Sequence, residues 1–524
     1  MTIPAYSRRG FLTAGGAALG IACVPSWLEA FDALQAAPGL DEAIANTALE
    51  AARRLRASYA DIRVSLYRQE SITTRERQVQ GVSRRGSFGF GVRVLVDGVW
   101  GFAASSRVEE DSARSAAEHA VAIARANAVA GRRRVTLAPV EKIVTSWNST
   151  LRRDPFDVPL DDKIAFLLKL NDTALGVAGV SFVNSQLLLV DEQKFFASTE
   201  GSRIRQRLVR TYPNFTVTAA DRATGDFQTR SVVDRAQLAG YEYVENGPWL
   251  RDAEKAGHEV VEKLQAQPVV SGTFDVVVDP SQLFLAVHET VGHSTELDRA
   301  LGWEANNAGT SFLKRTDIGT LRFGSPIVNL VADRTQPAGL ATVGYDDEGV
   351  PADRWYLVRG GVFVDWQTTR ELAAAIDQKR SHGCLQSDSW GSVPFPRMPN
   401  VSLQPAEADV TLDDLLADVK QGIYVEGRGS SSIDQQRYNF QFGGAVIREI
   451  RDGKLGAMVR DAVYQSRTPD FWASCDGIGG PATYRLWGTS QDGKGEPGQV
   501  SAVSHGCPVA RFRKVRVLNT AAGA

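Results

Sequence analysis

The stretch "TFDVVVDPSQLFLAVHETVGHSTELD", from Thr273 to Asp298, carries the strongest structural signal in the chain. Its opening run of valines predicts a buried strand that ends at Asp279, which is a favourable N-cap residue for a helix. Pro280 then occupies the first helical position, where its missing N–H costs nothing. Four apolar residues follow at helical spacing, namely Leu283, Phe284, Val287 and Val291. The stretch therefore predicts a buried strand followed directly by a helix with one apolar face.

Two histidines on this helix, His288 and His293, are five residues apart, whereas zinc-binding helices space them by four. Because each residue of an α-helix turns by ~100°, positions five apart lie ~140° apart around the axis. A π-bulge would return both side chains to one face, and Gly292 is the residue most able to absorb that change. Alternatively, the helix ends near Gly292 and His293 lies in the following loop. A shared metal site thus requires a local distortion of the helix.

The residue types around this pair suit a catalytic zinc site. Two neutral imidazoles bind Zn²⁺, a third protein ligand joins them, and the fourth position stays open for water. Glu289, beside the first histidine, would be the general base that takes a proton from this water. The residues alone also allow a simpler interpretation, in which two unrelated histidines fall near one another by chance.

The wider sequence resembles the TldD/PmbA family of metallopeptidases, whose catalytic members carry an HExxxH motif. The similarity consists of "HETVGHSTELD" at His288 and five later segments: "GTSF" from Gly309, "YDDEGVPADR" from Tyr345, "FPRMPN" from Phe395, "GIYV" from Gly422 and "DGKGEPGQ" from Asp492. The resemblance implies a zinc-dependent peptidase that hydrolyses peptides or unfolded polypeptides, with one Zn²⁺ per chain. It also implies a paralogous TldD/PmbA-type subunit or a homodimer as partner. The alternative is a non-catalytic scaffold or peptide-binding partner.

The third metal ligand is where this sequence departs from the family. Family members supply a cysteine in a Cys-Gly-Lys context, and Asp492 in "QDGKGEPGQ" occupies that place. The implied ligands are therefore His288, His293 and Asp492, since a carboxylate binds zinc acceptably and makes the site harder. Two alternatives stay open: Asp492 is a turn residue, or Cys507 in "VSHGCPVARFR" is the ligand. Cys507 and the nearby His505 also allow a cysteine hydrolase.

Other acids and histidines have weaker claims to the site. Glu296 and Asp298 match acidic positions of the family, which implies that they orient the histidines; the alternative is that they are helix-surface acids. The "DDEG" at Asp346 favours a hairpin turn over a ligand group. His119 and His258 lie on predicted helices with no acidic or histidine partner nearby, and we expect neither to bind metal.

The amino terminus is typical of a twin-arginine export signal. Arg8 and Arg9 precede the apolar pair Phe11 and Leu12, and a Gly/Ala-rich run follows. Residues 1–37 are therefore predicted to be a signal or leader, and the protein is predicted to be periplasmic or otherwise exported. If the leader were retained, the run would be near the ~18 residues at which a membrane anchor becomes conceivable.

Composition and patterning favour an α+β fold: an α/β N-terminal region followed by a β-rich C-terminal domain that carries the metal-binding helix. Lys and Arg (59) nearly balance Asp and Glu (61), so charge gives no support to nucleic-acid binding. The four cysteines lie far apart and predict neither a disulfide framework nor a structural zinc site. Beyond the leader we predict three domains: an α+β N-terminal domain at 38–130, a middle α+β domain at 155–268 and a β-rich catalytic domain at 269–520.

Overall fold

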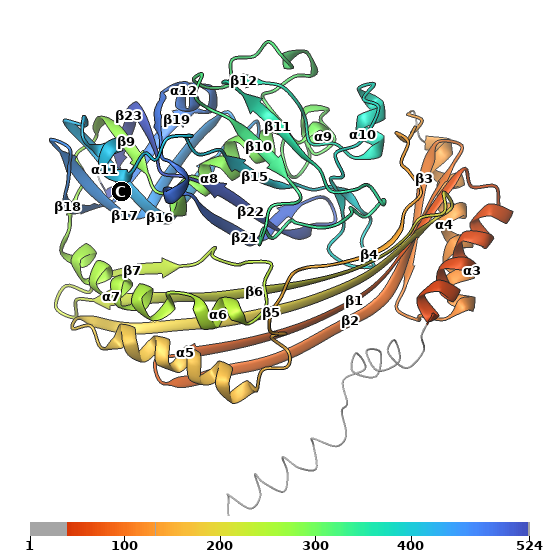
Figure 1. Cartoon of the computed structure of the whole chain (residues 1–524), viewed down its shortest axis with the longest axis horizontal. Coiled ribbons are helices and arrows are strands. Elements are labelled where there is room, and N and C mark those ends of the chain that lie inside the picture. The colour runs from red at the N-terminus through yellow and green to blue at the C-terminus, as the bar shows by residue number, and fades with distance from the viewer. Residues whose placement is uncertain (1–38, 131–132, 522–524) are drawn as a thin grey trace, which may run out of the picture.

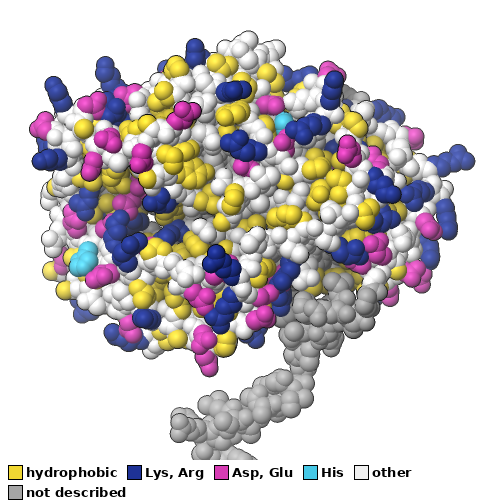
Figure 2. Space-filling model, in the orientation of Figure 1, with side chains coloured by type: hydrophobic (Ala, Val, Ile, Leu, Met, Phe, Trp, Pro, Cys, Tyr) yellow, Lys and Arg dark blue, Asp and Glu magenta, His cyan; other side chains and the backbone are white. Residues whose placement is uncertain are grey.

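The computed structural model describes residues 39–130 and 133–521. The export signal predicted for residues 1–37 lies outside them. Within the described residues, no helix combines the length and the apolar character needed to cross a membrane. On the face shown in Figure 2, basic and acidic side chains are interspersed, in keeping with their near-equal numbers.

One seven-stranded sheet dominates the N-terminal half of the described chain, with the order β3-β2-β1-β5-β6-β4 and with β7 paired to β6. Its strands are β1 (Tyr59–Arg75), β2 (Gln78–Val96), β3 (Val99–Ser105), β4 (Val144–Asn148), β5 (Val180–Ser198), β6 (Arg203–Ala220) and β7 (Phe227–Val232). β1 pairs with β5 along almost its whole length, from Asp61 opposite Ser198 to Arg75 opposite Asn184. Strands from both sides of residues 130–155 therefore belong to one curved sheet, which Figure 1 shows beneath the C-terminal elements.

Helices cover the two ends of this sheet (Figure 1). They are α3 (Leu40–Arg54), α4 (Glu110–Ala130), α5 (Leu160–Leu175), α6 (Glu242–Asn246) and α7 (Trp249–Gln265). α3 and α4 pack on β1, β2 and β3 around a core that includes Ile62 and Phe90. α5 and α7 pack on β5, β6 and β7 around a second core that includes Phe215 and Trp249. This mixture of long strands and covering helices confirms the predicted α+β fold, while the three domain boundaries stay a prediction.

The C-terminal part is rich in short strands, as the sequence predicts. An eight-stranded sheet has the order β16-β9-β23-β19-β17-β18-β8 with β20 paired to β23, and beside it lie a four-stranded sheet (β12-β11-β10-β15) and the pairs β13-β14 and β21-β22. The strands are β8 (Gln267–Pro268), β9 (Gly272–Val278), β10 (Leu330–Asp333), β11 (Arg354–Arg359), β12 (Val362–Phe363), β13 (Leu385–Gln386), β14 (Phe395–Pro396), β15 (Asn400–Leu403), β16 (Gln421–Ile433), β17 (Asn439–Arg451), β18 (Lys454–Arg460), β19 (Ala462–Arg467), β20 (Cys475–Ile478), β21 (Arg485–Lys494), β22 (Gln499–Cys507) and β23 (Ala510–Asn519).

Short helices connect these strands. They are α8 (Pro280–Ala286), η1 (Val287–Gly292), η2 (His293–Thr295), α9 (Leu297–Ala300), η3 (Arg315–Asp317), α10 (Arg370–Ala375), α11 (Leu412–Leu416), α12 (Thr468–Ala473) and η4 (Pro481–Thr483). The buried apolar residues of α8 and η1 belong to one large core with residues of both neighbouring sheets and of the β21-β22 hairpin. The helix that carries the two histidines is therefore held inside the C-terminal core.

Buried ion pairs join the long sheet to the C-terminal part. Lys194 of β5 donates to Asp347 at 2.8 Å, and Arg63 of β1 lies 3.5 Å from the same carboxylate. Beside them, Arg210 of β6 pairs with Glu192 of β5 at 2.7 Å. All five side chains are almost fully buried. We call this group of five residues the junction cluster.

The "DDEG" segment forms the predicted turn. Oδ1 of Asp346 accepts hydrogen bonds from the backbone N–H groups of Glu348 and Val350, at 3.0 and 2.9 Å. The next residue, Asp347, points toward the long sheet and belongs to the junction cluster. The segment therefore fixes the position of the C-terminal part on the sheet, which the turn pattern alone did not predict.

Candidate metal centre

The predicted strand, cap and helix are all observed. β9 leads into Asp279, whose side chain accepts a hydrogen bond from the backbone N–H of Ser281 at 2.9 Å and caps α8. After α8 the helix widens into the π-helical turn η1 and then tightens into the 3₁₀ turn η2. The rings of His288 and His293 consequently lie together, with centroids 4.6 Å apart. Of the two geometries that the sequence left open, the π-bulge is confirmed.

Gly292 has a different role from the predicted one. Its backbone angles, φ −52° and ψ −61°, are ordinary helical values that any residue adopts. A Cβ atom at this position would instead lie 2.4 Å from Sδ of Met398, in the "FPRMPN" segment. The glycine is needed for the close approach of this segment to the helix. The expectation that it supplies conformational freedom is therefore wrong.

The structure brings His288, His293 and Asp492 together, although Asp492 lies on β21, far along the chain. One ligand atom from each residue falls within 4.8 Å of the others. Nε2 of His288 and Nε2 of His293 are 3.7 and 3.5 Å from Oδ1 of Asp492, and all three side chains are buried. Ligands bound ~2.0–2.2 Å from one tetrahedral zinc ion lie about 3.3–3.6 Å apart. The three side chains therefore fit a divalent ion of this size.

A relay of hydrogen bonds sets the tautomer of His288. Nδ1 of His505 donates to the carbonyl oxygen of Val401 at 2.8 Å, so Nε2 of His505 is an acceptor. Nδ1 of His288 donates to that Nε2 at 2.8 Å. The lone pair of His288 is consequently on Nε2, the atom that faces Asp492. Burial lowers the pKa of His288 and of His505 to about 3, which keeps both rings neutral at neutral pH.

A buried carboxylate orients His293 in the same way. Nδ1 of His293 donates to Glu296 at 2.9 Å, which leaves its Nε2 lone pair directed toward Asp492. Glu296 also pairs with Arg299 and with Lys494, the latter at 2.8 Å. Burial opposes ionisation of Glu296, but Lys494 and Arg299 outweigh burial and hold its pKa well below the usual value. Lys494, the lysine of "DGKG", thus holds the carboxylate that orients His293.

Asp298 completes this support, because it lies 2.8 Å from the same lysine. Both acids are buried, with Glu296 and Asp298 each 1% exposed. The alternative that they are helix-surface acids is therefore wrong, and Glu296 has the orienting contact that the family resemblance implied.

Asp492 lies within β21, opposite Ser501 of β22, rather than in the turn that follows. Its Oδ2 accepts a hydrogen bond from Arg397 at 3.1 Å, which leaves Oδ1 to face the histidines. Burial raises the pKa of Asp492, and Arg397 opposes that change. Cys507, the competing ligand, is not part of the group; its Sγ donates to the carbonyl oxygen of Pro280 at 3.4 Å. Burial raises the pKa of this thiol well above its ordinary value.

Glu289 lies next to His288 but outside the ligand group. Its Oε2 accepts a hydrogen bond from Arg437 at 2.8 Å, and its side chain is 19% exposed, more than that of either histidine. Burial raises the pKa of Glu289, while Arg437 opposes the rise. A partly accessible carboxylate with a raised pKa beside a metal position suits proton transfer.

Four supporting residues were not assigned to this site from the sequence. Arg397 and Lys494 lie inside two of the motifs that carry the family resemblance, "FPRMPN" and "DGKG", so a signal for them was present. For His505, the sequence indicates only a pairing with Cys507. Arg437 had no local signal, because it reaches Glu289 from the loop between β16 and β17.

Two neutral imidazoles, a buried carboxylate and an adjacent glutamate together define a candidate single-metal centre of the hydrolase class. Models of one peptidase family match the same chain: PmbA/TldA metallopeptidase domain 1 over residues 60–124, the central domain over 153–267 and the C-terminal domain over 271–519. These ranges together cover most of the sequence. The chain therefore belongs to the PmbA/TldD family of metallopeptidases.

Relatives of similar length carry peptidase names. A protein named "Metalloprotease" from Methanothermobacter thermautotrophicus is 28% identical over 465 residues, which cover 89% of this chain and 96% of that protein. A "Zinc metalloprotease TldD homolog" from Saccharolobus solfataricus is 22% identical over 482 residues, which cover 90% and 98%. These names indicate a peptidase at the level of the family.

Solved structures share the fold over the same extent. A crystal structure from Thermotoga maritima has a TM-score of 0.72 at 16% identity and covers 90% of this chain and 99% of that chain. TldE from Thermococcus kodakarensis has a TM-score of 0.65 at 15% identity and covers 90% and 98%. At these identities the likeness shows the fold alone.

Proposed function

We propose that this chain is a zinc-dependent peptidase that holds one ion between His288, His293 and Asp492. The observation that carries the proposal is the convergence of three acceptor atoms within 4.8 Å, two of them on imidazoles whose other nitrogen is already engaged. The names of the relatives, metalloprotease and zinc metalloprotease, support the same reaction class. The proposed substrates are peptides or unfolded polypeptides, as the family resemblance implies.

In the proposed reaction, the bound ion, Glu289 and Arg437 have different roles. When bound, such an ion supplies Lewis acidity, which lowers the pKa of water toward ~7 and polarises a carbonyl group. Glu289 takes the proton from the water whose oxygen attacks the peptide carbonyl carbon, and it returns this proton to the leaving amine nitrogen as the C–N bond breaks. Arg437 holds Oε2 of Glu289, so the other carboxylate oxygen is the one available to the proton.

Peptide hydrolysis by the purified protein tests this function. A fluorogenic peptide is assayed with the zinc-loaded protein, with the chelated protein and with Glu289→Gln, while zinc content is measured in parallel. We expect Glu289→Gln to keep its zinc and to lose about 10²–10⁴-fold in rate, because general base catalysis contributes that much. Glu118→Gln, at an exposed position on α4, is the matched control and should match the wild type.

Retained hydrolysis in the chelated protein or in Glu289→Gln would overturn the proposed mechanism. A protein that binds peptides but hydrolyses none at any zinc level would instead support the alternative, a scaffold or peptide-binding partner. These outcomes separate the two classes of function without reference to any relative.

We further propose export by the twin-arginine route and pairing with a paralogous TldD/PmbA-type subunit or with a second copy. The resemblance to the TldD/PmbA family implies such a paralogous partner. Cell fractionation of the wild type and of Arg8→Lys/Arg9→Lys tests the first proposal, because loss of the arginine pair should retain the protein in the cytoplasm. Light scattering of the purified protein, alone and mixed with its paralogue, tests the second.

A further inference from the structure

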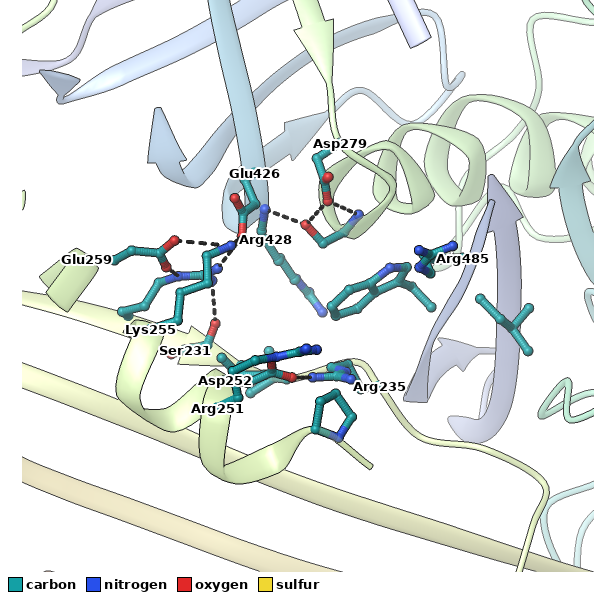
Figure 3. A pocket seen from close by; sticks show the side chains of 18 of the residues that line it. Ser231, Arg235, Arg251, Asp252, Lys255, Glu259, Asp279, Glu426, Arg428 and Arg485 are labelled. Atoms are coloured by element: carbon teal, nitrogen blue, oxygen red, sulfur yellow. Dashed lines mark hydrogen bonds and ion pairs between the residues drawn. The ribbon is translucent and has the colours of Figure 1, made fainter. Parts of the chain in front are cut away.

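A cavity of about 370 Å³ lies between the central and C-terminal parts of the chain. It is bounded by α7 and the end of β7 on one side, and by β16, the start of α8 and β21 on the other (Figure 3). The residues of the metal centre are not among those that line it. Its walls are strongly charged, which is unusual for a cavity that only separates two packed parts.

Basic residues outnumber acids along this cavity. The six basic side chains are Arg230, Arg235, Arg251, Lys255, Arg428 and Arg485, and the four acids are Asp252, Glu259, Asp279 and Glu426. Each of the four acids already has a partner within the protein. Glu259 and Glu426 form ion pairs with Arg230, and Asp252 forms one with Arg235. Asp279 caps α8 and accepts a hydrogen bond from the hydroxyl group of Tyr424.

Two arginines of the wall are left without a full carboxylate partner. Arg251 is 79% exposed and lies 3.9 Å from Asp252, which already pairs with Arg235. Arg485 forms no ion pair with any residue that the structure describes, and its guanidinium donates only to the carbonyl oxygens of Ala482 and Tyr484. The N–H donors of these two guanidinium groups are therefore available to bind an anion in the cavity.

The cavity adjoins the metal centre through shared elements. Ser281, in its wall, is seven residues before His288 on one continuous helix, which corresponds to about 10 Å. Trp487, also in its wall, lies opposite His505 in the β21-β22 hairpin, and His505 holds His288. One helix and one hairpin therefore connect the cavity to the metal centre, and Ser281 lies about 10 Å from His288 along that helix.

We infer that this cavity binds a carboxylate of the peptide substrate, on one side of the bond at the metal centre. The inference rests on the proposed peptidase function and specifies the substrate: a peptide with a carboxylate on one side of the cleavage position. Two sources have this chemistry, the C-terminal α-carboxylate and the side chain of Asp or Glu.

The size and charge of the cavity favour a single carboxylate over a larger anion. Only Arg251 and Arg485 lack a full partner, so a polyanion would bring more negative charge than the wall can neutralise. Trp487, whose indole stacks on Phe284 with centroids 6.4 Å apart, gives one wall a rigid apolar surface. A peptide side chain can pack on this surface while its carboxylate contacts the arginines.

Binding to the zinc-loaded Glu289→Gln protein tests the inference without hydrolysis. Three kinds of dansyl-labelled peptide, of equal length and otherwise neutral sequence, are compared by fluorescence anisotropy at low salt. One ends in an amide, one ends in a free carboxylate, and a third set ends in an amide and carries one Glu at successive positions. Each is measured with Arg251→Gln/Arg485→Gln and with Arg54→Gln, a control at an exposed arginine on α3.

We expect a carboxylate peptide to bind about tenfold more tightly than the neutral amide, and the double variant to remove this advantage while Arg54→Gln keeps it. Tighter binding of the free carboxylate identifies the α-carboxylate as the source, whereas tighter binding of a Glu peptide identifies a side chain. Equal affinities for all peptides, or an advantage that survives in the double variant, would overturn the inference. Failure of wild-type hydrolysis would overturn the peptidase proposal separately, because this binding measurement does not depend on turnover.

Discussion

The metal centre and the junction cluster both bury polar groups, but they satisfy them in different ways. At the junction cluster a carboxylate meets a cation directly, as Asp347 meets Lys194 at 2.8 Å. At the metal centre three acceptor atoms, on His288, His293 and Asp492, lie within 4.8 Å of one another, and the two histidine nitrogens are 3.7 and 3.5 Å from Oδ1 of Asp492, too far for direct hydrogen bonds. A buried charge that is paired with a protein group of opposite charge avoids the cost of being unpaired. Several buried acceptor atoms that face one another with no donor between them instead suit a cation.

Replacing the lysine of the junction cluster should have the largest effect on stability. Lys194→Met leaves Asp347 and Glu192 short of a cation in a buried place, so we expect a loss of about 3–5 kcal/mol in the free energy of unfolding. Urea denaturation followed by tryptophan fluorescence measures it. The zinc content of the folded variant should not change, since Lys194 contacts no metal ligand.

Lys169→Met, at an exposed position on α5, is the matched control and should be nearly neutral. A loss below about 1 kcal/mol in Lys194→Met would contradict the view that the junction cluster is a structural element.

Acid should weaken the junction cluster in a defined pH range. Burial opposes the ionisation of Glu192 and Asp347, but Lys194 with Arg210 or Arg63 outweighs burial and lowers the pKa of each carboxyl to about 2. Because these values lie below the unfolded ones near ~4, the ionised carboxylates stabilise the fold above ~pH 4, and this contribution is lost as the pH falls through about 2.

The free energy of unfolding of the chelated protein, measured from pH 6 to pH 2, should therefore fall below ~pH 4. Chelation removes the separate effect of acid on metal binding. Glu192→Gln should flatten this dependence, whereas Glu118→Gln should not. An equally steep dependence in Glu192→Gln would show that other groups dominate.

His505 should affect metal affinity without binding the metal. His505→Ala removes the acceptor that holds Nδ1–H of His288, so the imidazole loses its fixed orientation. We expect zinc affinity to fall about 10–100-fold, as is usual for residues that orient metal ligands. Competition with a chromophoric chelator measures this change. His258→Ala, at an exposed position on α7, should bind zinc as the wild type does.

The smallest expected effect concerns the close contact at Gly292. Gly292→Ala places a Cβ against Met398, and overpacking of this kind costs about 1–3 kcal/mol. In the background of Met398→Ala the Cβ has room, so the cost of Gly292→Ala should shrink in a double-mutant cycle. If Gly292→Ala costs the same in both backgrounds, the glycine is needed for its backbone conformation and not for the close approach of Met398.

Local pattern predicted the elements of the metal centre better than their long-range partners. The valine run, Asp279, Pro280 and the apolar spacing each act within a few residues, and they correctly predicted the strand, the cap and the helix. The five-residue histidine spacing narrowed the geometry to a π-helical turn or a helix that ends near Gly292, and the structure has the π-helical turn. Asp492 came from the family resemblance alone.

Contacts between distant strands could not be predicted from pattern. His505 meets His288 only because β22 lies in a given register beside β21 and β15, and register depends on the whole sheet. Arg437 reaches Glu289 from a loop, where no periodicity constrains a side chain. The single sheet shared by residues on both sides of 130–155 was hidden for the same reason, since strand pairing over that distance leaves no local signal.

The most direct test of the central claim is the zinc content of three purified proteins: the wild type, Asp492→Ala and Cys507→Ala. If His288, His293 and Asp492 hold the ion, the wild type and Cys507→Ala should each contain one zinc per chain, and Asp492→Ala should contain far less while remaining folded. Full zinc occupancy in Asp492→Ala, or its loss in Cys507→Ala, would contradict the assignment of the third ligand and with it the proposed centre.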